Sequence, residues 1–240
     1  MLNFLKSIFK IFIRFDSSEL RKLTWIEYEA DLSLNHEKAK EAFDRAWTTR
    51  NFEIDLYWKR ATYFWAIIAS TFVGYFALVT SESYVNPDGF NHVEVYLLIC
   101  IGFIFSTAWF LINKGSKTWQ KNWEVHIDLL EDNFTGPLYK TINATRTFSV
   151  SKINEIVSFG LILIWGLLGA KYLVQQNLLN FNPAGKINWF VLFASIGVIL
   201  GLMSMLFGYG RGKSKNREFE MYRRKFTLEE KVNSAANQQS

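Results

Sequence analysis

Cysteine and histidine are scarce in this sequence, and their scarcity excludes several kinds of site. One residue of 240 is cysteine, Cys100, so the chain can form no internal disulfide and can offer no pair of thiols to a metal. The three histidines are His36, His92 and His126, and the topology argued below puts His92 on the opposite side of a membrane from the other two. We therefore expect no metal centre built from histidines of one chain, and no cofactor.

Charged residues are almost missing from four long apolar blocks, residues 61–80, 93–112, 156–174 and 188–208. Each block has about the ~20 residues that an α-helix needs to cross the ~30 Å of a bilayer's hydrocarbon. A helix on the core of a soluble protein would carry a polar stripe with a period of 3.6 residues, and these blocks carry none. The sequence predicts an all-α membrane protein with four transmembrane helices.

Basic residues are nearly absent from two of the three connections between these blocks. Of 27 lysines and arginines, only Lys171 and Lys186 lie outside the segment before the first block, the long middle connection and the tail. Lysine and arginine near a span are retained in the cytoplasm. Both termini and the middle connection are therefore predicted to be cytoplasmic.

The first fifteen residues resemble a signal peptide briefly, but Lys6, Lys10 and Arg14 interrupt every stretch that could be its apolar core. A helix here would have one polar and one apolar face, which is typical of a helix lying in the interface of an anionic membrane. Packing of the same helix on the protein's own cytoplasmic part is the alternative.

This topology divides the chain into six segments that alternate between cytoplasm and membrane. They are an amphipathic interfacial helix (1–15), a cytoplasmic helical region (16–60), a transmembrane hairpin (61–113), a cytoplasmic helical connection (114–152), a second transmembrane hairpin (153–210) and a basic cytoplasmic tail (211–240).

Aromatic and basic residues near the ends of the spans are predicted to anchor the chain at the membrane interfaces. They are Trp58, Lys59, Arg60, Trp65 and Lys171. Lys171 lies nineteen residues after Lys152, or ~28 Å along a helix, so it can reach the outer headgroups. Glu155 lies within one turn of the inner boundary and is also interpreted as an anchor, with a ring of Glu155 side chains at a pore mouth as the alternative.

The stretch that follows the second block combines two tryptophans with a histidine. If residues 114–131 continue the helix, spacings of three and four place on one face Trp119, Asn122, Trp123, His126, Ile127 and Leu130. A catalytic interpretation would use His126 as a general base oriented by Glu124 or Asp128. Residues two apart on a helix diverge, however, and this face offers no serine, cysteine or second histidine. We expect no enzymatic activity and interpret the face as a packing surface.

The fourth block contains Gly197 and Gly201 in the sequence GVILG. Small residues at this spacing allow helix backbones to approach closely in lipid. The motif predicts close packing and leaves open whether the partner helix is in the same chain.

Three pieces of the sequence resemble the RipA family of octameric bacterial membrane proteins. They are LYWKRATYFWA (56–66), KGSKTWQKNWEVHIDLLED (114–132) and TGPLYKT (135–141). The resemblance implies a bacterial inner-membrane protein with cytoplasmic termini that assembles as a homo-oligomer, an octamer, without a known enzymatic activity. In pathogens the family is linked to growth inside host cells.

Two functions from different classes remain open on these observations. The first is an oligomeric scaffold or channel of the inner membrane that supports envelope or stress adaptation, or host-associated growth. The second is a membrane-permeabilising effector of a bacterial antiviral defence system. A transporter or membrane enzyme is disfavoured, because the spans lack mid-membrane charges and Pro/Gly breaks. Nucleic acid is not an expected partner, since the basic residues form no isolated face and no known motif.

Overall fold

The computed structural model describes residues 20–22, 24–33, 36–81, 93–141, 148–175, 188–207, 210 and 222–224. Its main elements are the helices α2 (Trp25–Ser33), α3 (His36–Val79), α5 (Val93–Leu130), α6 (Val150–Gln175) and α7 (Trp189–Phe207). Four of these, α3, α5, α6 and α7, are long and apolar enough to cross a membrane. The prediction of an all-α protein with four transmembrane helices is confirmed.

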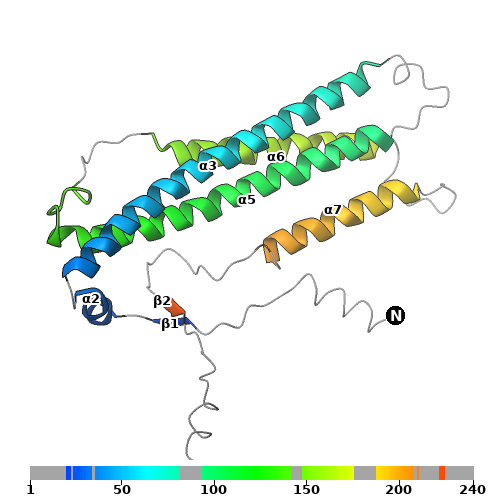
Figure 1. The fold of residues 1–240 in the computed structure, drawn as a ribbon. Helices are drawn as coiled ribbons and strands as arrows, with labels where there is room; N and C mark the ends of the chain where they lie inside the picture. The colour runs from blue at the N-terminus through cyan, green and yellow to red at the C-terminus, as the bar shows by residue number, and fades with distance from the viewer. Residues whose placement is uncertain are drawn as a thin grey trace, which may run out of the picture.

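Helices α3 and α5 are longer than a membrane span. They contain 44 and 38 residues, against the ~20 that cross the hydrocarbon. Figure 1 shows them side by side along nearly their whole length. The segment before the first apolar block, residues 36–60, has no glycine or proline to interrupt the helix. The second span continues as helix through Leu130, one residue short of the stretch 114–131 considered from the sequence.

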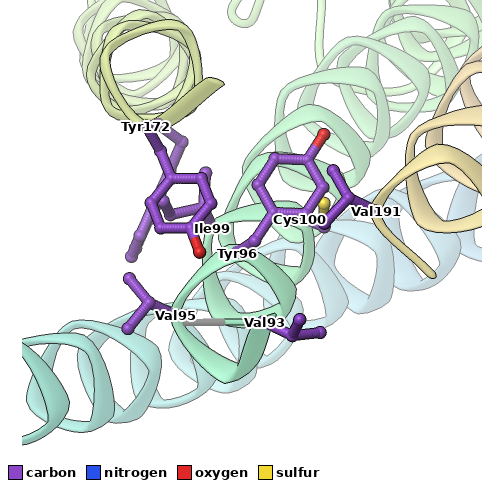
Figure 2. Packing of buried hydrophobic residues seen from close by; sticks show 8 residues of the cluster. Val93, Val95, Tyr96, Ile99, Cys100, Tyr172 and Val191 are labelled. Atoms are coloured by element: carbon purple, nitrogen blue, oxygen red, sulfur yellow. The ribbon is translucent and has the colours of Figure 1, made fainter. Parts of the chain in front are cut away.

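Helix α5 is the central helix, because it packs against α3, α6 and α7. Tyr96 of α5 shows how it joins two of them. Its ring stacks on that of Tyr172 in α6, with 5.5 Å between the ring centroids, and its hydroxyl forms a 2.6 Å hydrogen bond with that of Ser195 in α7. Figure 2 shows Tyr172 and Val191 reaching toward Tyr96 and Cys100 from two different helices.

The backbone of α5 at Gly102 lies against the side chain of Trp165 in α6. A Cβ at this position would lie 2.2 Å from the indole ring of Trp165 in α6. Trp165 has no exposed surface, and its ring stacks on Phe72 of α3 with centroids 4.3 Å apart. The missing side chain of Gly102 therefore allows one tryptophan to pack between three helices.

A short pair of strands departs from the expected all-helical extramembrane parts. β1 (Leu20–Lys22) pairs antiparallel with β2 (Tyr222–Arg224), with Arg21 opposite Arg223. Residues 20–22, within the predicted helical region 16–60, therefore form a strand and not a helix. Four spans put the two segments on the same side of a membrane, as their pairing requires. The predicted interfacial helix 1–15, and the tail 211–240 apart from β2, lie outside the described residues.

Substitution of Gly102 by alanine is expected to destabilise the bundle, because the new Cβ would collide with Trp165. Overpacking of this kind costs about 1–3 kcal/mol. Gly160 in α6 is the matched control, since a Cβ there would meet no atom within 4 Å. Gly160→Ala should be neutral or stabilising by up to about 1 kcal/mol through helix propensity. Thermal unfolding in detergent measures both, and equal melting temperatures for the two variants would contradict this account.

Candidate functional site

A second hydrophobic cluster joins α3 and α5 outside the apolar blocks. Its buried members are Phe43 and Ala46 of α3 and Ile127 and Leu130 of α5. Further aromatic side chains pack around them, namely Trp47, Trp123, Phe134 and Tyr139. We call this group of residues the extramembrane cluster. It is the candidate functional site, because it is a packed core on the long helices at a distance from the membrane.

One carboxylate shapes the chain where α5 ends. Glu131, fully buried in the short 3₁₀ helix η1 (Glu131–Asn133), accepts hydrogen bonds from the backbone N–H groups of Tyr139 at 2.6 Å and Lys140 at 2.9 Å. Backbone donors of this kind satisfy a buried charge. The carboxylate therefore folds residues 134–141 back onto the end of α5, with Gly136 at a positive φ of 66° in the turn.

An arginine closes the cluster on the side of α3. The guanidinium of Arg50 lies over the rings of Trp47 and Tyr139, 5.8 Å and 5.6 Å from their centroids. Burial raises the pKa of the Tyr139 hydroxyl, and the charge of Glu124 acts in the same direction. Tyr139 is therefore a neutral aromatic surface for the cation.

Helix α2 is tied to the extramembrane cluster through His126. The hydroxyl of Tyr28 lies 2.8 Å from Nδ1 of His126, and the imidazole also contacts the ring of Trp123. Burial lowers the pKa of His126 and raises that of Tyr28 to about 12. A capping box starts α2, since Thr24 and Glu27 exchange side-chain and backbone hydrogen bonds. His126 thus connects helices that are distant in sequence.

The predicted packing face on α5 is divided in two by the structure. Ile127 and Leu130 are buried in the extramembrane cluster, and Trp123 packs against it. Trp119 instead exposes 49% of its surface and takes no part in the cluster. The predicted face is therefore not one unit, and Trp119 is the part of it that remains available to another molecule.

The other predicted residues lie mostly on the outside of the bundle. Trp58, Lys59, Trp65 and Lys171 are exposed, and Glu155 is half-buried. A Cβ at Gly197 or Gly201 would meet no atom within 4 Å, so their close partner is not within the described part of this chain. The anchoring and packing roles of these residues remain predictions.

A polar seam along α5 was missed by the sequence analysis. Ser106, Asn113, Ser116 and Gln120 are all buried, at spacings of three, four and seven residues. Ser116 accepts a 2.9 Å hydrogen bond from Arg60 of α3, which was predicted as a membrane anchor. Nearby, Asn154 of α6 donates to the hydroxyl of Tyr57 at 2.7 Å. The helical spacing of these polar residues was the signal in the sequence, and at Ser116 it corresponds to a hydrogen bond between helices.

Side chains that bind metals do not come together in the part of the chain that the structure describes. No group of three or more His, Cys, Asp or Glu side chains there could hold a metal ion. Cys100 lies buried among apolar residues of α5, α6 and α7.

Comparison with protein families identifies a match. The model of the octameric membrane protein family (8xMP) matches residues 40–174, which is more than half of the chain. The matched range begins in α3 and ends in α6, so it includes α5, all but the first turn of α3 and the extramembrane cluster. No curated protein and no solved structure matches the chain.

Removal of the Glu131 charge is expected to loosen the turn that follows α5. Glu131→Gln keeps one acceptor but turns an amide toward backbone donors, at a cost of about 1–3 kcal/mol. Hydrogen exchange at the amides of Tyr139 and Lys140 should quicken, and the melting temperature should fall. Asp132→Asn is the control, because Asp132 is exposed and its pair with Lys140 is worth less than about 1 kcal/mol. Equal effects of the two variants would contradict the role given to Glu131.

Acidification is expected to weaken the attachment of α2. The folded-state pKa of His126 lies below its ordinary value of 6.5, so the unfolded state binds the proton more readily. The stabilisation is full above pH 6.5 and is lost as the pH falls below it. The melting temperature, followed from neutral to mildly acidic pH, should therefore drop.

One histidine variant assigns this pH dependence to a residue. His126→Asn keeps an acceptor near the position of Nδ1 but cannot titrate, and it should flatten the pH profile. A pH dependence that survives in His126→Asn would exclude His126 as its source.

Proposed function

Because the chain belongs to the octameric membrane protein family (8xMP), we propose that it acts as a non-enzymatic octameric scaffold or channel of the bacterial inner membrane. Its resemblance to the RipA family supports a role in envelope or stress adaptation, or in host-associated growth. The bilayer and further copies of the same chain are its partners in this proposal.

Charge supports a cytoplasmic position for the extramembrane cluster. The parts of α3 and α5 that lie at the cluster or between it and the first two spans are rich in basic residues, such as Arg45, Arg50, Lys117 and Lys121. Positive charge of this kind stays in the cytoplasm. The pairing of β1 with β2 is consistent with this orientation, because the proposal puts both termini in the cytoplasm as well.

One observation carries the proposal: α3 and α5 run without interruption from the extramembrane cluster into the membrane. A continuous helix pair is a stiff connection, and the hydrogen bond from Arg60 to Ser116 links the two helices between the cluster and the membrane core. A change in the packing of the cluster would therefore reach the spans directly.

The same connection favours a second candidate function, the triggered effector of an antiviral defence system. In that function a cytoplasmic signal received at the cluster would move α3 and α5 and permeabilise the membrane. The two functions differ in when the membrane conducts, since a scaffold never conducts and an effector conducts after its trigger.

Conductance of the purified oligomer distinguishes a channel from the other two functions. Size-defined wild-type octamer, checked by native mass spectrometry, is placed in planar bilayers. Steady conductance that follows the octamer fraction is expected for a channel. A stable octamer that never conducts would overturn the channel and leave the scaffold and the untriggered effector. A wild-type monomer would overturn the proposed assembly.

Replacement by alanine is expected to have different effects at Trp119 and at Trp123 of α5. Trp119 is half-exposed and outside the cluster, so Trp119→Ala should shift octamer toward smaller species while the protomer keeps its melting temperature. Trp123 packs on the cluster, so Trp123→Ala should lower the stability of the protomer, by about 2–3 kcal/mol for a partly buried tryptophan. Native mass spectrometry and thermal unfolding give the two readouts. An unchanged octamer in Trp119→Ala would remove Trp119 from the interface.

A further inference from the structure

Helix α7 uses one face within the chain and leaves another open. Val191 is its one buried residue in the described structure, and Ala194, Ser195 and Val198 lie on the same side, toward α5. At 100° per residue, Gly197 and Gly201 lie about a quarter turn from this contact. Both glycines face open space. We call this surface the glycine face of α7.

A shallow, open groove lined partly by small side chains lies between α3 and α5. Its lining residues are Ala66, Ile67, Ser70, Thr71 and Leu98, and its volume is about 410 Å³. Ala66 and Ser70 are exposed and four residues apart, and Gly74 continues the series toward Leu98. The α3 side of the groove therefore includes small residues at the spacing found on α7. Two such surfaces can bring helix backbones close together in lipid.

The two surfaces lie on opposite flanks of the molecule. Phe105 and Trp109 of α5 contact α3, whereas Tyr96 of α5 contacts α7. These directions are roughly opposite around the axis of α5 at 100° per residue, and Figure 1 shows α3 and α7 on either side of α5. The glycine face cannot reach the groove of its own chain, but it can reach that of a neighbour. A contact between two different faces of identical subunits, repeated from copy to copy, can close a ring.

The depths of the two surfaces in the membrane agree. Copies in a ring share one orientation, so a contact must join residues at one depth. Ala66 lies five residues after the start of the first apolar block, and Gly201 six residues before the end of α7, on the same side of the membrane. These distances are ~8 Å and ~9 Å along a helix. Ser70 and Gly197 agree equally well, at ~14 Å and ~15 Å.

We propose that the glycine face of α7 docks into the groove formed by α3 and α5 of the next copy. The contact forms between Gly197 and Ser70 and between Gly201 and Ala66, with the two helices running in opposite directions. It rests on the proposed octamer, to which it adds the interface between subunits. The partner that covers the groove is a second copy of this chain, because the family is octameric and a repeated contact between different faces is what a ring of identical subunits requires.

Disulfide cross-linking between copies tests the contact directly. The full-length chain with Cys100→Ser removes the single native thiol, and Ser70→Cys is then combined with Gly197→Cys. Mild oxidation in membranes should give a ladder of covalent oligomers. Ser70→Cys combined with Ile199→Cys is the control, because Ile199 lies at nearly the same depth and faces away from the glycine face. A control pair that cross-links as well as the test pair would overturn the proposal.

A bulky residue on the glycine face gives an independent test. Gly201→Ile should convert most of the octamer to smaller species while the melting temperature of the protomer stays the same. Gly160→Ile on α6 also enters open space and should leave the octamer intact. An octamer that survives Gly201→Ile and does not cross-link through Ser70 and Gly197 would overturn this interface and leave the octamer itself standing. A Cys100→Ser protein that is already monomeric, like a monomeric wild type, would overturn both.

Discussion

The contact of Trp165 with the backbone at Gly102 determines how the three packed spans meet. Trp165 is fully buried among α3, α5 and α6, and it occupies space that any side chain at position 102 would fill. Lipid tails are as apolar as the helices, so burial alone gives spans little reason to associate. Close packing and stacking on Phe72 supply the attraction instead. Tyr96, less than two turns away, extends the same packing to α6 and α7.

Outside the membrane a different force holds the long helices together. Phe43 and Ile127 are buried against each other's helices in an aqueous setting, where removal of apolar surface from water is favourable. Glu131 completes this core, because its charge holds the backbone of the following turn. Helices α3 and α5 therefore connect two cores. The core outside the membrane is stabilised by the hydrophobic effect, and the core between the spans is stabilised by close packing. The hydrogen bond of Arg60 with Ser116 lies between the two.

The sequence was informative where a physical rule acts within one helix, and less so where the partner lies elsewhere. Length and hydropathy are enough to predict the four spans. The lack of glycine and proline is enough to predict that α3 extends beyond its span. Spacing alone put Trp119 and Trp123 on one face, but it could not tell that Trp123 packs against the extramembrane cluster while Trp119 stays exposed. Pairing of Tyr28 with His126, and of β1 with β2, joins segments 98 or more residues apart that share no motif. A carboxylate that captures backbone N–H groups, as Glu131 does, looks in sequence like any acidic residue after a helix.

Exposed apolar side chains are a poor guide to the assembly of this protein, because the surface of every membrane helix is apolar where it meets lipid. Phe193 and Leu167 are both exposed, and nothing in their chemistry separates an interface from a lipid contact. Small residues are more informative. A glycine in a helix lowers helix propensity, and a neighbour that must come close is a reason for its presence. Gly102 has such a neighbour within the chain, and Gly197 and Gly201 do not. In a family of octamers, the space above these two glycines is best explained by the helix of an adjacent subunit.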